Sequence, residues 1–319
     1  MKHYGAKLTG ALMACAMSVA ALPATALDAV TIGSTVATSS HYTLAVALSK
    51  AIKTGMPDAN VTVVETGASV DNMRRLSKGE VNIGMTSVDV GTQALNGTKA
   101  FEGHQIEDLV GLFPYDMSVL NIVVREDSGI TTLAGLDGQP FGAGDRGSAA
   151  EVVSKATLEA NGINPDWYAG SIGDAVEALK NRQIVGFAKY GPGTRLDAVL
   201  QEILTSTDLR LLSYDDDQQK VTLDSIDGIG FAEVPADRIP GKPAATLPVS
   251  LVIYATRSEL MTDDDAYELV KSVYENRSEM IDAWPFLADF DFKARALQIE
   301  ELGLPLHPGA KRFWESLEE

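Results

Sequence analysis

The sequence is poor in the residues on which most metal and thiol sites depend. It has one cysteine and four histidines in 319 residues. The cysteine, Cys15, lies in the N-terminal apolar segment, and the histidines are too scattered to predict a metal centre. The acidic run Asp215-Asp216-Asp217 lacks the spacing of a calcium loop and is interpreted as a solvated run. We therefore predict no metal, no cofactor and no thiol chemistry.

Recognisable catalytic motifs are also missing. The sequence has no Gly-x-Ser-x-Gly elbow and no Walker phosphate loop. A serine triad can assemble from distant positions, so an enzyme on this chain stays an alternative. Nothing in the sequence points to such a triad, and the prediction is a protein that is not an enzyme.

Basic residues are few relative to acidic ones. There are 26 Lys and Arg against 44 Asp and Glu, which gives a formal charge of −18. This balance opposes binding to nucleic acid or to anionic membrane surfaces. Hydrophobic residues make up 45% and charged residues 22%, as in globular proteins, and the length favours about two domains.

The N-terminus has the pattern of an export signal. Two lysines precede an apolar run at 8–21, and Ala24-Thr25-Ala26 fits the small-x-small cleavage rule. We therefore exclude residues 1–26 from the fold and expect the mature chain to be a periplasmic monomer. Two alternatives stay open: the run is a single-pass anchor, or Cys15 is lipidated.

Residues 61–89 are the stretch around which the chain is organised. A β-branched run at 61–64 stops at Thr66-Gly67, a helix with one apolar stripe starts near Ser69, and 81–85 is a second strand. Such a unit predicts a parallel sheet with a right-handed crossover. Its turn presents backbone N–H groups at a helix N-terminus, which favours an anion.

The same alternation of strands and helices recurs along the chain and predicts an α/β fold with two lobes. Two extended apolar runs are expected to cross between the lobes, and the segment 214–248 is interpreted as loop with short strands. The predicted divisions are 27–118 with 256–319 for lobe 1, 125–246 for lobe 2, and hinge strands at about 119–124 and 247–255.

Three polar turns follow strands and precede helices, at 35–42, 66–72 and 145–150. In an open α/β sheet such turns lie at the carboxyl edge, where ligands bind. Helix capping is the alternative, with Ser148 to Glu151 as a capping box and Ser69 with Asn72 acting similarly.

Arg146 and Tyr190 stand out near these turns. An arginine beside a glycine can hold a carboxylate through two hydrogen bonds, unless it is only a solvated surface residue. Tyr190 ends a strand and could form a wall of the pocket, or pack as a turn aromatic on the surface. The predicted ligand-binding residues are Thr35, Thr38, Ser39, His41, Tyr42, Gly67, Ala68, Ser69, Ser87, Arg146, Gly147, Ser148, Ala149, Ala150, Tyr190 and Gly191.

With these residues identified, nearly the whole mature chain resembles the TAXI family of solute-binding proteins, the extracytoplasmic receptors of TRAP transporters. The resemblance rests on segments that occur in one order: Thr66 to Asn72 with Arg74 and Leu76, Gly79-Glu80 through Asp89 to Asn96-Gly97, Asp127 to Ile130 with Leu136 to Gly138, and Pro305 to Ala310. It implies a type II periplasmic-binding fold with a hinged cleft, small carboxylate ligands such as glutamate or other dicarboxylates, and delivery to a sodium-driven permease.

The sequence departs from the family pattern inside the proposed pocket. The first loop has no glycine after Gly33, Ser87 is followed by Val88-Asp89 without the usual preceding Gln, and the usual Gly-Ser-Gly-Thr becomes Gly147-Ser148-Ala149-Ala150. We therefore expect a small organic anion as ligand without assigning glutamate. A receptor for an ABC importer and a periplasmic sensor subunit are the alternatives with the same fold.

Overall fold

The computed structural model describes residue 1 and residues 29–193 and 196–318. The predicted signal segment from residue 2 onward, including Cys15, lies outside the described residues. No helix in the described ranges is both long and apolar enough to cross a membrane.

A single mixed sheet runs through the molecule. Its strand order is β2-β1-β3-β10-β4-β7-β5-β6, with β8 paired to β4 and β9 paired to β10. The parallel pairs β1–β2, β1–β3, β5–β6 and β5–β7 flank the antiparallel centre. The strands are β1 (Ala29–Gly33), β2 (Asn60–Val64), β3 (Ile83–Ser87), β4 (Leu109–Arg125), β5 (Pro140–Gly142), β6 (Asp166–Tyr168), β7 (Gly186–Pro192), β8 (Leu209–Leu211), β9 (Ile229–Val234) and β10 (Ala245–Arg257).

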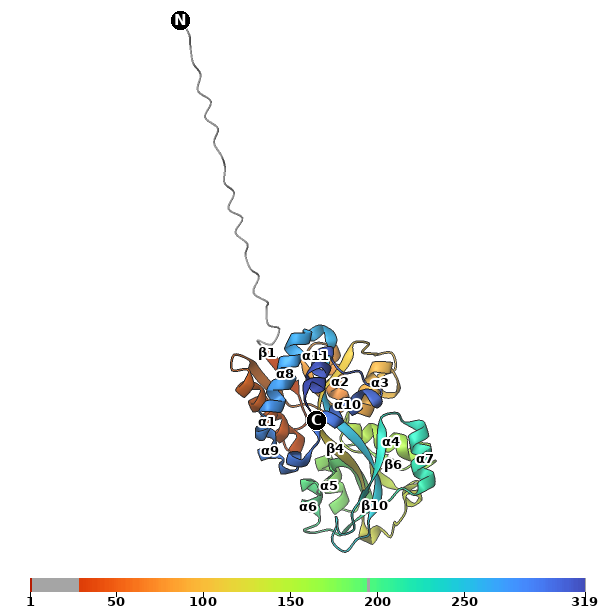
Figure 1. Cartoon of the computed structure of the whole chain (residues 1–319). Coiled ribbons are helices and arrows are strands. Elements are labelled where there is room, and N and C mark those ends of the chain that lie inside the picture. Colours follow the sequence, from red (N-terminus) through yellow and green to blue (C-terminus); the bar gives the residue numbers. More distant parts are fainter. Residues whose placement is uncertain (2–28, 194–195, 319) are drawn as a thin grey trace.

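The two longest strands form the centre of the sheet and reach from one half of the molecule into the other (Figure 1). β4 has 17 residues and β10 has 13, and they pair antiparallel. The sequence predicted a hinge strand at about 119–124, and in the structure this segment is continuous with residues 109–113. Pro114 lies between them, and the pairing shifts register beside it, between Val252 and Ile253, which lets the strand continue past a residue without an N–H.

Helices cover the sheet in two groups, one above and one below the middle of the long strands in Figure 1. The first group includes both early and C-terminal helices, so the chain returns to the half in which it began. The helices of the first group are α1 (Ser40–Gly55), α2 (Ser69–Ser77), α3 (Val88–Asn96), α8 (Asp263–Glu275), α9 (Ser278–Ala283), α10 (Phe292–Glu301) and α11 (Pro308–Ser316). Those of the second are α4 (Ala149–Ala160), α5 (Ile172–Lys180), α6 (Ala198–Ile203) and α7 (Asp216–Ser225).

The apolar core divides in the same way. One buried cluster contains Tyr115 and Leu251, whereas the clusters of the other half begin at Val119 and end at Val249. The division therefore falls in the middle of β4 and β10. We propose that these two halves are the two lobes, and we call them lobe 1 (the half with both termini of the described chain) and lobe 2.

The segment 214–248, predicted as loop with short strands, contains a helix, α7. Asp215 caps this helix: its side chain accepts the N–H of Gln218 at 2.9 Å, and the Gln218 side chain accepts the N–H of Asp215 at 3.0 Å. Asp216 and Asp217 occupy the first turn, where the helix dipole favours negative charge. The acidic run is thus a helix start and not only a solvated run.

Candidate functional site

A cavity of about 750 Å³ lies between the two halves, a size typical of small-molecule sites. Its walls are the turns before α1, α2 and α4 and the turn between β6 and α5. Its floor is formed by the central strands, through side chains of β3, β4, β7 and β10. Both halves therefore contribute to one site.

Most of the predicted ligand-binding residues line this cavity. They are Thr35, Ser39, His41, Gly67, Ala68, Ser69, Ser87, Arg146, Ser148, Ala149, Ala150 and Tyr190. The three polar turns, distant in sequence, are brought together because each follows a strand of the same sheet.

Four of the predicted residues do not line the cavity: Thr38, Tyr42, Gly147 and Gly191. Thr38 is exposed at the outer end of its turn, and Tyr42 lies within the first turn of α1. Gly191 packs against neighbouring side chains, since a Cβ added there would lie 3.0 Å from the Asp197 Cβ and 3.2 Å from the Asn121 side-chain nitrogen. Gly147 contacts the other half of the molecule, as described below.

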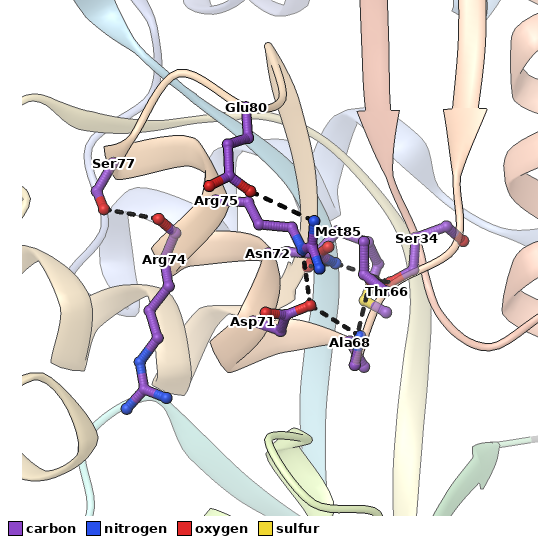
Figure 2. Close-up of polar contacts among 11 residues, drawn as sticks. Ser34, Thr66, Ala68, Asp71, Asn72, Arg74, Arg75, Ser77, Glu80 and Met85 are labelled. Atoms are coloured by element: carbon purple, nitrogen blue, oxygen red, sulfur yellow. Dashed lines mark hydrogen bonds and ion pairs between the residues drawn. The ribbon is translucent and has the colours of Figure 1, made fainter.

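The turn before α2 carries its own anion. Ala68 precedes the helix with φ 74° and gives no side-chain cap. The Asp71 carboxylate accepts the Gly67 N–H at 3.0 Å and is paired with Arg75 at 2.8 Å (Figure 2). Although burial acts in the opposite direction, the Gly67 N–H and Arg75 lower the pKa of Asp71. Asp71 thus supplies, at the N-terminus of α2, the negative charge that the sequence analysis assigned to a bound anion.

The alternative interpretation, in which Ser69 and Asn72 cap α2, is wrong, because no side chain caps this helix. Asn72 instead donates its side-chain amide to the carbonyls of Ser34 and Met85, both at 2.8 Å, which ties α2 to the ends of β1 and β3 (Figure 2). The hydroxyl of Ser69 lies 4.0 Å from the Met85 sulfur. A buried amide between two strands is therefore structural, and sequence spacing alone could not distinguish it from a cap.

The turn before α4 follows the capping interpretation in part. Ser148 accepts the Glu151 N–H at 3.2 Å, as an N-cap does. The Glu151 carboxylate accepts the Gly147 N–H at 2.7 Å in place of that of Ser148, and it also pairs with Lys155 at 2.8 Å. The turn is thus one residue longer than a capping box, because Glu151 binds the residue before the N-cap.

Arg146, at the tip of this turn, is an exposed cation at the cavity. It makes no hydrogen bond or ion pair with any described residue. The next carbonyl, that of Gly147, accepts the Val70 N–H at 3.1 Å. The turn therefore joins α2 across the cavity, and it leaves the guanidinium available for a ligand.

Lys189 is a functional candidate that the sequence did not reveal. It lines the cavity from β7, and its ammonium lies 2.9 Å from the Asp197 carboxylate and donates to the Tyr190 carbonyl at 3.2 Å. The two side chains are 16% and 5% exposed. The only signal was a lysine near the end of a predicted strand, and its partner Asp197 lies in a different element.

His41 faces Lys189 from the other half of the molecule. Its Nδ1 lies 3.1 Å from the Tyr115 hydroxyl, and the centroid of its ring lies 5.1 Å from the centroid of the Trp284 ring. Desolvation among these groups lowers the pKa of His41 to about 4, and the Lys189 charge adds to the effect. The ring is therefore neutral near pH 7, so Arg146 and Lys189 supply positive charge in the site.

The floor of the cavity is rich in hydroxyls. Ser87, Ser118 and Ser250 line it, and the Tyr190 hydroxyl lies 2.8 Å from that of Ser250. Behind them lies Asp89, only 1% exposed, in the first turn of α3. Burial raises its pKa to about 6, against the opposing effect of the nearby Ser250 and Ser87 hydroxyls.

Comparison with known proteins agrees with this architecture. The sequence model of the NMT1-like family matches residues 32–316. The chain belongs to the NMT1-like family. Among solved structures it is similar to a protein from Xanthomonas citri, XAC2383 bound to ATP, with 15% identity and a TM-score of 0.55 over 91% of this chain and 100% of that one.

The chain is also similar in fold to a second solved structure. It is the alkanesulfonate-binding protein SsuA from Xanthomonas axonopodis pv. citri bound to MOPS, with 18% identity and a TM-score of 0.51 over 90% of this chain and 83% of that one. The predicted fold class is confirmed: this member of the NMT1-like family has the mixed α/β fold of periplasmic solute-binding proteins. The finer assignment to the TAXI family stays a prediction.

Proposed function

We propose that this protein is a periplasmic solute-binding receptor that captures a small organic anion by lobe closure and delivers it to a membrane permease. The observation that carries the proposal is the cavity between the halves, with Arg146 unpaired among the described residues and directed to the site from a turn that already bridges the two halves. The ligands we favour are carboxylates, dicarboxylates or acidic amino acids such as glutamate.

The charges of the site support an anion in two places. The Arg146 guanidinium has no protein partner among the described residues, so a ligand carboxylate could take two of its N–H donors. The Lys189 ammonium has donors beyond those that Asp197 and Tyr190 occupy. Alkanesulfonate, the compound named for the SsuA protein of the same fold, is likewise an organic anion.

Hinge closure is the mechanism we propose. β4 and β10 cross between the halves, and the contact of Gly147 with Val70 is made across the cavity. A ligand that bridges Arg146 and the turn before α1 would favour the closed arrangement by its contacts to both halves. The closed surface would then be recognised by the permease.

Ligand capture is tested by thermal unfolding with a panel of carboxylates, amino acids and sulfonates, beside native mass spectrometry of the freshly purified protein. Because a ligand that binds only the folded state stabilises it, the melting temperature should rise with dose, by an amount that reflects about 2.7 kcal/mol at a hundredfold excess over Kd. Absence of any shift across the panel would contradict the proposal.

The role of Arg146 is tested by Arg146→Ala. Loss of a charge-assisted contact should weaken anion binding by about 1.5–3 kcal/mol while the fold is retained. Arg312→Ala is the matched control, since Arg312 is exposed and paired with Asp264 at 2.7 Å, away from the cavity. Unchanged affinity in the first variant would make Arg146 an ordinary surface residue.

The permease class is a separate part of the proposal. We favour a TRAP permease on the resemblance to the TAXI family, and an ABC importer is the alternative with the same receptor fold. Uptake into vesicles that contain the permease encoded beside this protein decides between them. Dependence on a sodium gradient would support the TRAP assignment, and dependence on ATP would support the ABC importer.

A further inference from the structure

The turn before α2, in lobe 1, is held by three residues spaced four apart in the sequence. The Gly67 N–H donates to the Asp71 carboxylate at 3.0 Å, and the Arg75 guanidinium donates to the same carboxylate oxygen at 2.8 Å. Asp71 and Arg75 lie on one face of α2, where residues four apart are neighbours. The backbone at Gly67 is thus held by a side chain of its own lobe.

The turn before α4, in lobe 2, is held in the same way. The Gly147 N–H donates to the Glu151 carboxylate at 2.7 Å, and the Lys155 ammonium donates to the other oxygen of that carboxylate at 2.8 Å. The order of glycine, acid and base at intervals of four residues is that of the turn in lobe 1. In each lobe, therefore, one turn at the cavity has its glycine N–H occupied by its own acid.

These two turns contact each other backbone to backbone. The Gly147 carbonyl accepts the Val70 N–H at 3.1 Å. A Cβ added to Gly67 would lie 3.5 Å from the Arg146 carbonyl oxygen, and one added to Gly147 would lie 3.8 Å from the Gly67 carbonyl oxygen. The glycines therefore face the opposite turn, and their lack of side chains lets the two backbones approach.

The contact completes the start of α2. The first N–H groups of a helix have no partner within the helix, and no side chain caps α2. Val70 is in the first turn of α2, and its N–H finds its acceptor in the other lobe. Ala149, the first residue of α4, is 7% exposed and belongs with Val70 to the buried apolar cluster of lobe 1. Opening of the lobes would expose both this N–H group and apolar surface.

We infer that Asp71 and Glu151 are positioning residues of a latch between the lobes, which consists of the turns 66–70 and 145–149. By holding Gly67 and Gly147, the two acids keep the Gly147 carbonyl at the Val70 N–H. The latch favours the closed arrangement before a ligand binds, so less of the binding free energy is spent on closure.

The effect of the latch on ligand capture rests on the proposed function, but the contact between the lobes can be measured without a ligand. The measurement is residue-resolved hydrogen exchange of the Val70 amide in the ligand-free protein. In Glu151→Ala, a change in the other lobe, this amide should exchange about tenfold faster, because its acceptor is no longer held in place. The Asn72 amide, which donates to the Ala68 carbonyl at 2.8 Å within lobe 1, should be unchanged.

Two further variants show that the effect belongs to the latch. Glu151→Gln keeps an oxygen that can accept the Gly147 N–H, and it should restore most of the protection of the Val70 amide. Asp215→Ala is the matched control, since Asp215 is an acid that accepts a backbone N–H at the start of α7, also in lobe 2. It should leave the exchange of Val70 as in the wild-type protein.

The consequence for binding is measured by calorimetry with glutamate, aspartate, malate and succinate. Asp71→Ala and Glu151→Ala should each weaken binding about fivefold, and together by less than the product of the two effects, because they act through one contact. Glu151 lines the cavity, so a purely electrostatic effect of removing its negative charge would instead tighten the binding of an anion.

The outcomes separate the two proposals. The latch is refuted if the Val70 amide exchanges in the wild-type protein like an unprotected amide, if Glu151→Ala leaves its exchange unchanged, or if the two alanine variants bind carboxylates as tightly as the wild-type protein or more tightly. The receptor would stand in each of these cases. If none of the four carboxylates binds the folded wild-type protein while the Val70 amide responds as expected, the proposed ligand class is refuted and the latch stands.

Discussion

Replacing the buried carboxyl of Asp89 by an amide should change how the stability of this protein depends on pH. Asp89 is 1% exposed and its carboxylate oxygens have no hydrogen-bond partner of good geometry among the described residues. Burial raises its pKa from 3.8 to about 6, although Ser250 and Ser87 act in the opposite direction. The folded state therefore holds the proton more tightly than the unfolded state does.

The direction of the pH dependence follows from this difference in pKa between the folded and unfolded states. Stabilisation by the protonated group is complete below pH 3.8 and is lost as the pH rises through about 6. A pKa difference of about 2 units at about 1.4 kcal/mol per unit corresponds to about 3 kcal/mol. His41 has the opposite effect, since its lowered pKa of about 4 makes the folded state less stable as the pH falls from 6.5. In the wild-type protein alone, these two opposite contributions to the pH dependence of the unfolding free energy would therefore partly cancel.

The measurement is urea unfolding of the wild-type protein and Asp89→Asn, followed by tryptophan fluorescence from about pH 4 to about pH 7. Taking the difference between the two proteins removes the contribution of His41. Relative to wild type, the free energy of unfolding of the variant should rise by about 3 kcal/mol between the lower and the higher pH. Asp227→Asn, a change of an exposed aspartate in the loop before β9, is the control. A difference that stays constant with pH would refute the argument that Asp89 is a desolvated carboxylate.

Two further predictions concern the cavity. Lys189→Met leaves Asp197 buried without its cation and should lower the free energy of unfolding by about 3 kcal/mol, which Lys189→Met with Asp197→Asn should partly restore in urea unfolding. Gly228, just before β9 in one half of the molecule, meets Asp89 of α3 in the other half, and an added Cβ would lie 3.0 Å from the Asp89 Cα. Because this contact joins the two halves, Gly228→Ala should oppose closure and weaken ligand binding about tenfold. Gly138→Ala, with φ +67° and nothing within 4 Å, is the control for backbone strain, and equal affinities in the two variants would contradict the closure argument.

Local sequence patterns predicted most of the secondary structure. In α5, Ile172–Lys180, the apolar stripe and the capping box at Ser171 agree on the helix bounds, so local sequence is enough to define this helix. By contrast, the sequence analysis missed α7. This helix has few apolar residues, and its only buried residue is the polar Thr222, so no apolar stripe marks it. The short strand β6 was missed as well, because three residues give no period to detect.

The sequence also predicted part of the candidate site, namely the turns that line it. Turns that follow strands share one edge of the sheet, so the turns at Ser39, Ala68 and Arg146 could be placed together from the sequence. Lys189 and Asp197 could not be paired in this way, because their contact depends on the arrangement of β7 and the start of α6. The position of Asp89 behind Ser250 is likewise a contact between α3 and a strand late in the chain.

The sequence by itself determined the α/β class, the strand–turn–helix unit around residues 61–89 and the polar turns at the sheet edge. These features depend on side-chain period and on backbone preferences within a few residues. Only the tertiary structure decided that Asp71 occupies the α2 N-terminus and that Arg146 has no partner among the described residues. The charge and hydrogen-bond direction of a site depend on which groups desolvate and pair with one another across the fold, and local sequence does not contain that information.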